Sequence, residues 1–303
     1  MSFQSDRMPL VYDAVIVGAG PAGVSCAVWL SRLGFNPILV DAAHEVGGLC
    51  RINPFMDDWN ASLPGVNGLQ VARNLAESVA QSSVVLRLGW PVQTAQVSKP
   101  GFQVSGPDNE TLHGRFLVLA TGVKARGLNQ VTSNPLVLVG PGQHVAGFDF
   151  ANKRVAVLGG GDNAFENALF AFEKGASGVQ VYARTVRAQQ QFVQQLPVGC
   201  LATGDYTVDP DRCTVNGQPY DAILVMYGWT PNADFAADLG LARTQRGFIS
   251  IDFEPAQTRR DGVYAVGEVA SRQHPCVVTA LADGVTAAKA IQARLETGMG
   301  VSG

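Results

Sequence analysis

Long runs of like-charged residues are missing from this sequence. Of its 303 residues, 22 are Lys or Arg and 25 are Asp or Glu, which gives a formal net charge of −3. Proteins that bind nucleic acid or an anionic membrane surface usually carry a basic patch, because binding neutralises phosphate groups. The charge pattern therefore argues against both partners and favours small-molecule ligands.

Long apolar runs are missing as well. No segment is long enough to span a bilayer, and Met1–Leu10 has no basic stretch followed by an apolar one. We therefore expect a cytoplasmic protein. Its length suggests roughly two domains, and a hydrophobic content of 47% is sufficient for a core in each.

Cysteine is scarce and widely spread. The five cysteines are an odd number over a long chain, which excludes the disulfide framework of a small secreted protein. Any disulfide would be catalytic rather than structural. We expect Cys26 to lie in the core, while Cys200 and Cys213 could face each other across a hairpin without a function. The cysteines are Cys26, Cys50, Cys200, Cys213 and Cys276.

Glycine, by contrast, is abundant and forms two fingerprints about half a chain apart. These are Gly18-Ala19-Gly20-Pro21-Ala22-Gly23 and Gly159-Gly160-Gly161-Asp162-Asn163-Ala164, each between an apolar strand and an apolar helix. In such a loop the missing Cβ atoms let the backbone approach a pyrophosphate, and the next helix directs unpaired N–H groups at it. The sequence therefore predicts two dinucleotide sites.

The remaining pattern predicts an α/β fold. Apolar runs bounded by turn residues indicate strands, and longer apolar periodicity indicates helices. Predicted strands cover 13–17, 37–40, 116–120, 154–158, 178–182, 222–226 and 262–267, predicted helices cover 22–33, 68–82, 163–174 and 277–295, and 93–105 forms a hairpin.

The two fingerprint units differ at the end of their second strand. In the first unit that strand ends at Asp41, where an acidic side chain can accept hydrogen bonds from both ribose hydroxyls of an adenine nucleotide. In the second unit no acid follows the strand, and Arg184 and Arg187 stand close by. Their guanidinium groups suit a 2′-phosphate, or they are solvated surface arginines.

The order of these motifs carries a resemblance over almost the whole chain. It resembles two-domain FAD and NAD(P)H oxidoreductases, and most of all the low-molecular-weight thioredoxin reductases. The motifs are Gly18–Gly23, Asp41, Gly47-Gly48, Ala120-Thr121-Gly122, Gly159–Ala164, Val263-Tyr264-Ala265-Val266-Gly267-Glu268, Arg272-Gln273, Val277-Val278-Thr279-Ala280 and Asp283-Gly284.

The resemblance implies two Rossmann-like, three-layer domains, the second inserted in the first. The FAD-binding domain would comprise residues 1–122 and 244–303, and an NAD(P)H-binding domain would comprise 123–243. FAD, together with NADPH or NADH, would be the cofactors. The resemblance also implies a homodimer, with a redox protein as a candidate partner.

Site residues follow from the same resemblance. FAD would lie along the first fingerprint and the closing helix, whose positive end would face the flavin. Glu268 takes the place of the family's usual aspartate. Glu166 resembles a residue on the nicotinamide side, or is a surface glutamate. The implied FAD residues are Gly18, Gly20, Gly23, Asp41, Gly48, Thr121, Gly122, Glu268 and Val277, and those of the second nucleotide are Gly159, Gly161, Asn163, Glu166, Arg184 and Arg187.

Three departures from the family pattern bear on function. Thioredoxin reductases carry Cys-x-x-Cys where this chain has Gly142-Gln143-His144-Val145, so that relay is chemically excluded here. His144 is a proton donor near the flavin or a loop histidine without a role. The arginine motif after the second strand is incomplete. The stretch 189–220 is short for the family's sheet meander, which predicts a trimmed domain.

The sequence therefore predicts an FAD-dependent oxidoreductase that passes electrons between a pyridine nucleotide and an unidentified acceptor. One alternative is a disulfide oxidoreductase that uses Cys50 and Cys276. Another is a ferredoxin/flavodoxin–NADP reductase-like enzyme, although such enzymes continue past the closing helix, where this sequence has only 297–303. The last is a non-catalytic sensor that binds flavin or nucleotide.

Overall fold

The computed structural model describes residues 10–298 apart from 54, 57–58, 271 and 273, and it divides them into two compact units. Unit 1 contains the described residues of 10–51, 55–123 and 231–298. Unit 2 contains 52–53 and 124–230. The chain therefore leaves unit 1 once to build most of unit 2 and then returns to it.

The chain returns to unit 1 at residue 231 and not at 244, the boundary expected from the sequence. The short 3-10 helix η3 (Asp234–Leu239) explains the difference, because it packs against strand β4 (Thr94–Ser98) of unit 1. Ala233, Ala236 and Leu239 are almost fully buried in that unit's core.

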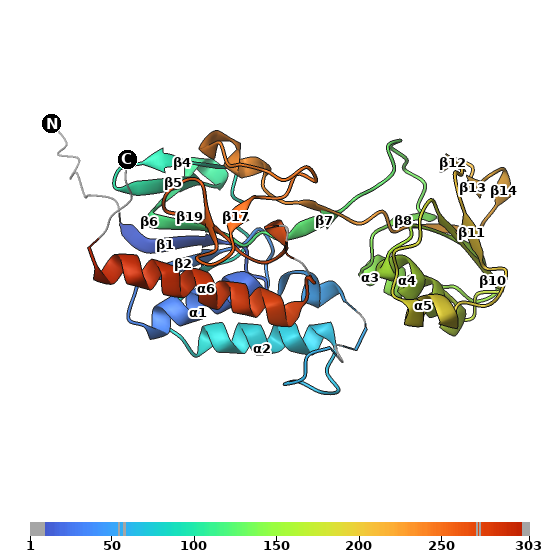
Figure 1. Ribbon diagram of the computed structural model, residues 1–303, viewed down its shortest axis with the longest axis horizontal. Coiled ribbons are helices and arrows are strands. Elements are labelled where there is room, and N and C mark those ends of the chain that lie inside the picture. The colour runs from blue at the N-terminus through green and yellow to red at the C-terminus, as the bar shows by residue number, and fades with distance from the viewer. Residues whose placement is uncertain (1–9, 54, 57–58, 271, 273, 299–303) are drawn as a thin grey trace. The chain divides into compact units, whose positions relative to one another are not determined.

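A nine-stranded sheet forms the middle of unit 1 (Figure 1). Its main order is β17-β18-β19-β6-β1-β2-β3, and β4 and β5 form an antiparallel hairpin attached to β6. The strands β19, β6, β1, β2 and β3 pair in parallel. The strands are β1 (Val11–Val17), β2 (Pro37–Val40), β3 (Val85–Arg87), β4 (Thr94–Ser98), β5 (Gly101–Ser105), β6 (Thr111–Leu119), β17 (Ile251–Asp252), β18 (Gln257–Thr258) and β19 (Val263–Ala265).

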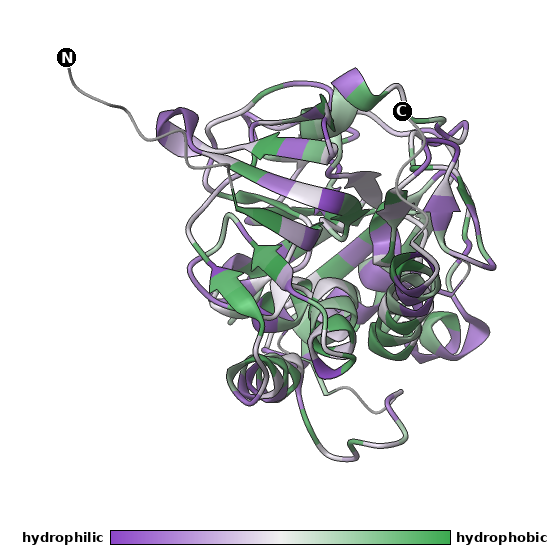
Figure 2. Cartoon of the chain, turned by 90° about the vertical axis from the view of Figure 1, so that its left-hand side faces the viewer, coloured by the Kyte–Doolittle hydropathy of each residue, from purple (hydrophilic) through white to green (hydrophobic). Residues whose placement is uncertain are grey.

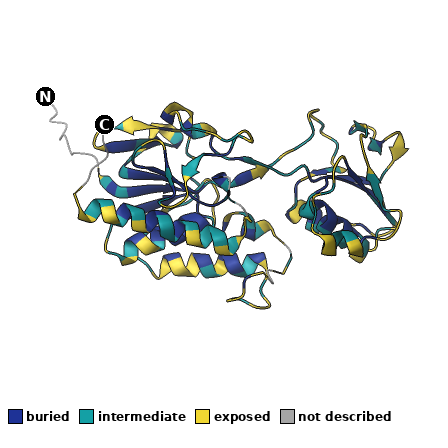
Figure 3. Cartoon of the chain, viewed as in Figure 1, coloured by how far each residue is buried: buried dark blue, intermediate teal, exposed yellow. Residues whose placement is uncertain are grey.

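Different layers cover the two faces of this sheet. On β1, Ala14 and Ile16 face the helices α1 (Pro21–Arg32), α2 (Gly68–Ala80) and α6 (Val277–Glu296), which lie together on one side (Figure 1). Val15 and Val17 face the other way, toward β4, β5 and η3. Figure 3 shows the parallel strands of the sheet as a buried layer between the two, and Figure 2 shows hydrophobic segments in both the strands and the helices of the chain. This alternation follows from the two-residue period of a strand.

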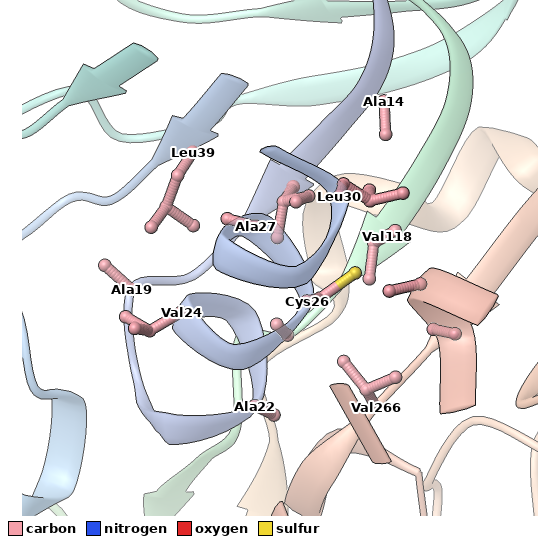
Figure 4. Packing of buried hydrophobic residues seen from close by; sticks show 14 of the residues in the cluster. Ala14, Ala19, Ala22, Val24, Cys26, Ala27, Leu30, Leu39, Val118 and Val266 are labelled. Carbon is pink, nitrogen blue, oxygen red and sulfur yellow. The ribbon is translucent and has the colours of Figure 1, made fainter. Parts of the chain in front are cut away.

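Helix α1 is apolar almost all round because it is enclosed by β1 and by α6. Cys26 lies among Val24, Ala27 and Leu30 with no exposed surface, which confirms its predicted place in the core (Figure 4). A Cβ on Gly284 of α6 would lie 2.4 Å from the carbonyl oxygen of Ala22. The two helices therefore pack closely enough to require glycine at this point.

Unit 2 is built around a five-stranded parallel sheet in the order β11-β10-β9-β15-β8. The helices α3, α4 and α5 contribute to the core on one face, and a small three-stranded antiparallel sheet lies over the other. Its elements are β8 (Val137–Val139), α3 (Gln143–Ala146), β9 (Arg154–Leu158), α4 (Asp162–Glu173), β10 (Gly178–Ala183), α5 (Gln190–Gln195), β11 (Leu201–Thr203), β12 (Val208–Asp209), β13 (Thr214–Val215), β14 (Gln218–Pro219) and β15 (Ala222–Val225).

The small sheet corrects one expectation about cysteine. Cys213 lies between β12 and β13 and packs with Val215, Ile223 and Val225 on the face below that sheet. Cys200 packs on the opposite face with the helices. The two thiols are therefore separated by the parallel sheet and do not face each other across a hairpin.

Five short elements complete the described structure. β7 (Val123–Ala125) pairs with β16 (Trp229–Pro231), so the outgoing and returning segments of the chain run together as a two-stranded ladder. The others are the 3-10 helices η1 (Gly48–Ile52), η2 (Pro107–Asn109) and η4 (Gly267–Val269).

Candidate dinucleotide-binding sites

The first glycine loop, residues 18–23, connects β1 to α1 at the carboxyl edge of the unit 1 sheet. Two of its glycines are required by the protein's own packing. Gly18 has φ +110°, and a Cβ there would lie 2.3 Å from the carbonyl oxygen of Ala120. A Cβ on Gly23 would lie 1.9 Å from the carbonyl oxygen of Gly18. These two glycines fix the tight turn and the approach of helix to strand.

Gly20 is not required for the same reasons. Its φ of −78° suits any residue, and the nearest atom to a Cβ at this position would be the Cα of Gly48, 3.9 Å away. Gly20 also caps α1 without a side chain, and the first turn contains no acidic residue. The helix end therefore presents free N–H groups and its positive dipole end. Packing does not explain this glycine, but close approach of an anionic ligand does.

Asp41 lies directly beside this loop. One carboxylate oxygen accepts from the backbone N–H of Ala19 at 2.5 Å, and the other accepts from that of Ala43 at 2.7 Å. Because each carboxylate oxygen can accept more than one hydrogen bond, both retain capacity for a ligand hydroxyl. The structure thus brings the predicted ribose acceptor to the glycine loop.

The Gly47-Gly48 pair packs against the same loop. The N–H of Gly47 donates to the carbonyl oxygen of Ala19 at 2.8 Å. A Cβ on Gly48, whose φ is +54°, would lie 3.0 Å from the Cα of Gly20. Gly48 therefore lies next to the position that Gly20 leaves open.

Thr121 and Gly122 are held by Asn232, a residue that the sequence analysis did not single out. Asn232 donates from Nδ2 to the carbonyl oxygen of Thr121 at 3.3 Å, and from its backbone N–H to that of Gly122 at 3.0 Å. The Thr121 hydroxyl donates to the carbonyl oxygen of Asn232. Asn232 belongs to no sequence motif and lies in the short segment between Pro231 and η3.

Gly267 and Glu268 form the start of η4 at the end of β19. The N–H of Gly267 donates to Asp283 of α6 at 3.1 Å, and Asp283 forms an ion pair with Arg272 at 2.6 Å. Burial raises the pKa of the half-buried Glu268. Burial also raises the pKa of Asp283, against the opposing effects of Arg272 and the Gly267 N–H. Gln273, part of the resembling motif, lies outside the described residues.

Val277 is the first residue of α6, and Cys276 caps that helix. The Cys276 backbone N–H donates to the Thr279 hydroxyl at 3.0 Å, and its thiol is exposed. Cys50, in η1, is only 8% exposed. Neither Cys50 nor Cys276 forms a disulfide in the structure, so their redox pairing stays a prediction. The same holds for a role of His144, an exposed residue of α3.

The second glycine loop, residues 159–164, lies in unit 2 and has the same kind of geometry as the first. A Cβ on Gly159 would lie 2.3 Å from the carbonyl oxygen of Met226, and one on Gly160 would lie 2.0 Å from that of Thr185. Gly161 has φ −101° and nothing within 4 Å of such a Cβ. Again, one glycine at the start of a helix is left unexplained by packing.

A cavity of about 660 Å³ opens over this loop, which we call the unit 2 cavity. Three arginines and one aspartate line it, so its charge is positive although the whole chain is negative. The aspartate, Asp162, accepts from the backbone N–H of Gln189 at 2.8 Å and from its side chain at 3.0 Å. The charged lining residues are Arg126, Arg184, Arg187 and Asp162, joined by Asn163, Tyr206 and Tyr227.

The predicted second-site residues come together only in part. Gly159, Gly161, Asn163, Arg184 and Arg187 all line the unit 2 cavity. Glu166 lies one turn further along α4 and is not among the lining residues. Burial raises the pKa of its carboxyl, and the nearby Asp162 adds to the rise. The sequence pattern gave no sign of Arg126, Tyr206 and Tyr227, because they are distant in sequence from the fingerprint.

Two glycine loops, each at the start of a helix after a buried parallel strand, define the class of two-domain dinucleotide-binding oxidoreductases. More particularly, the chain belongs to the pyridine nucleotide-disulphide oxidoreductase family, whose model matches residues 12–284. Members of this family in general use FAD and NAD(P)H. Among the residues described, no helix is both long and apolar enough to cross a membrane.

Individual relatives share about a quarter of their residues with this chain. One subunit of the alkyl hydroperoxide reductase of Staphylococcus epidermidis is 26% identical over 94% of this chain, but the match spans only 59% of that protein's length. The ferredoxin–NADP reductase of Granulibacter bethesdensis is 27% identical over 86% of this chain and 82% of its own. Lactococcus lactis thioredoxin reductase has the same fold, with a TM-score of 0.80 at 22% identity, over 94% of this chain and 99% of its own.

Proposed function

We propose that the protein is an FAD-dependent oxidoreductase that takes electrons from NADPH or NADH and passes them to an acceptor other than through a Cys-x-x-Cys relay. One observation carries this proposal: each glycine loop contains a glycine, Gly20 or Gly161, that the protein's own packing does not require. Family membership supports the same cofactors.

In unit 1, the residues around Gly20 fit FAD. The N–H groups at the start of α1 would bind the pyrophosphate, with Gly18 and Gly23 shaping the loop and Asp41 accepting from the adenosine ribose. Gly48, Thr121 and Gly122 would lie along the cofactor. Glu268 would hydrogen-bond near its ribityl chain, and the helix that begins at Val277 would direct its positive end at the flavin.

In unit 2, the positive cavity fits a second, polyanionic dinucleotide. Gly159, Gly161 and Asn163 would hold its pyrophosphate at the start of α4. Arg184 and Arg187 would bind the 2′-phosphate of NADPH, because a guanidinium group matches phosphate oxygens. Glu166 would contribute on the nicotinamide side.

Bound FAD would supply the capacity to accept a hydride from the nicotinamide and to release electrons onward. The protein's contribution is to bind both nucleotides and to orient them for that transfer. The names alkyl hydroperoxide reductase and ferredoxin–NADP reductase refer to different acceptors. The likeness to both therefore supports a common kind of electron donor for this chain, but it does not identify the acceptor. As further expectations, we propose a redox protein as the acceptor and a cytoplasmic homodimer.

Anaerobic stopped-flow spectroscopy of the purified protein tests this proposal. We expect the flavin absorption band to bleach within about a second of mixing with NADPH or NADH, in the range of ordinary enzyme turnover. Gly161→Ala should slow that bleaching while dithionite still reduces the flavin fully. A protein that binds FAD but is bleached by neither nucleotide would refute the proposed electron donor and favour a sensor.

A further inference from the structure

Four of the chain's six tyrosines lie in unit 2 as two hydrogen-bonded pairs. The hydroxyls of Tyr182 and Tyr220 are 2.8 Å apart. The hydroxyl of Tyr206 donates to that of Tyr227 at 3.2 Å. The pairs are also linked, because the rings of Tyr182 and Tyr206 pack with their centroids 5.6 Å apart.

Only one of the two pairs lines the unit 2 cavity. Tyr206 and Tyr227 belong to its lining, together with the three arginines, while Tyr182 and Tyr220 do not. Tyr182 is 7% exposed and lies behind Tyr206 as a support. The ring of Tyr182 therefore packs against the Tyr206–Tyr227 pair on the side away from the cavity, and this contact limits the positions that the Tyr206 ring can adopt.

The direction of the hydrogen bond leaves one proton for a ligand. Because Tyr206 donates to Tyr227, the proton of the Tyr227 hydroxyl is not used within the pair. Burial raises the pKa of Tyr227, and the nearby Arg184 lowers it only in part. The phenol therefore keeps its proton at neutral pH and can act as a donor.

Arg184 supplies the charge next to this donor. Its side chain is 77% exposed, and its ion-pair partner within the described structure is the fully exposed Asp205, at 3.9 Å. Such a long, solvated pair contributes little, so a phosphate can displace Asp205 at low cost. Arg184 also affects the ionisation of Tyr227, which places the two groups in one electrostatic environment.

We propose that the Tyr206–Tyr227 pair is a specificity determinant of the unit 2 cavity, in which Tyr206 orients the Tyr227 hydroxyl to donate to the 2′-phosphate that Arg184 attracts. This inference rests on the proposed function of the cavity as a pyridine-nucleotide site. It adds a neutral, oriented donor to the arginines, and a phosphate oxygen accepts from such a donor more strongly than a ribose hydroxyl does.

Calorimetric titration with two small probes, adenosine 2′,5′-bisphosphate and 5′-AMP, tests the inference on the full-length, FAD-loaded protein. Native protein should bind the bisphosphate more tightly than 5′-AMP. Tyr227→Phe should weaken the bisphosphate by about tenfold and 5′-AMP by less than about threefold. Tyr206→Phe, which removes only the orienting bond, should give a smaller loss in the same direction. Tyr220→Phe removes a paired hydroxyl outside the cavity and should change neither affinity.

Other outcomes separate this inference from the proposed function. If Tyr227→Phe weakens both probes equally, or neither, the hydroxyl does not read the 2′ position and the inference is wrong while the site stands. Equal affinity of the native protein for both probes would also overturn it and would leave NADH as the donor. Native protein that binds neither probe would refute the nucleotide site itself.

Discussion

The amide of Asn232 donates to the carbonyl oxygen of Thr121, and the hydroxyl of Thr121 donates back to the carbonyl oxygen of Asn232. These residues are 111 positions apart in sequence and flank the segment 124–230, which forms most of unit 2. Their reciprocal bonds fix the loop after β6, which lies at the carboxyl edge of the sheet where ligands of α/β proteins bind. Asn232 is therefore a positioning residue for Thr121 and Gly122.

Replacement of Asn232 by alanine should weaken FAD binding by about tenfold, because the loop loses its side-chain hydrogen bond. Equilibrium dialysis of the FAD-free protein against FAD measures this directly. Asn36→Ala, at an exposed position of the same unit, should leave the affinity unchanged. An unchanged affinity in Asn232→Ala would show that the Thr121 loop does not contact the cofactor.

Gly18 and Gly20 should respond differently to alanine. Gly18→Ala forces a methyl group against the Ala120 carbonyl at positive φ and should destabilise the fold by about 3 kcal/mol or more. Gly20→Ala should leave the melting temperature of the FAD-free protein nearly unchanged but reduce FAD affinity by about tenfold or more. Thermal melts with and without FAD distinguish the two. If Gly20→Ala retains full affinity, no ligand approaches this backbone.

Arg184→Ala should reduce NADPH affinity relative to NADH by about tenfold, through the loss of a charge-assisted bond to the 2′-phosphate. The ratio of flavin-reduction rates with the two nucleotides, each at subsaturating concentration, reports the change. Arg212→Ala is the matched control, since Arg212 is 83% exposed, forms a comparable 3.8 Å ion pair and does not line the cavity. An unaltered ratio in Arg184→Ala would identify Arg184 as a solvated surface arginine.

Glu166→Gln should change stability in a pH-dependent manner. Burial and Asp162 raise the Glu166 pKa above its ordinary value of 4.5, so folding disfavours the charged form. Its contribution to stability is present below that ordinary value and is lost as pH rises through the raised pKa. The glutamine variant should therefore melt about 1–2 °C higher than native protein at pH 7 and at the same temperature at pH 4.

Partial exposure of Glu166 keeps that effect small. Glu173→Gln, at an exposed position near the end of the same helix, controls for the general change in net charge. A constant difference between Glu166→Gln and native protein across this pH range would contradict the prediction.

The sequence predicted the elements around both glycine loops because they depend on local patterns. The strands that end at Val17 and Leu158, and the helices that follow them, form within a few residues of the predicted bounds. Asp41 and Arg184 were placed by their offset from a strand, and both lie beside their loops. Local periodicity and glycine spacing suffice for such features.

Features that depend on distant segments were not predictable in the same way. Asn232 contacts Thr121 in unit 1 only because the tertiary fold brings two separate loops together. The same is true of Tyr206 and Tyr227 in unit 2. The return to unit 1 at residue 231 depends on small apolar residues of η3 that pack on β4 rather than on any turn signal. Cys213 and Cys200 were misjudged because nearness in sequence does not show which face of a sheet a side chain occupies.

The segmented construction of unit 1 bears on how the protein is made. Its strand β6 pairs with β1 on one side and with β19 on the other, and α1 lies against α6. The unit 2 sheet, in contrast, comes from one uninterrupted stretch between β8 and β15. Because a chain emerges from the ribosome amino end first, unit 2 can complete its sheet while unit 1 still lacks the strands β17, β18 and β19 and the helix α6. Unit 1 is thus the last part of the described structure to become whole during synthesis.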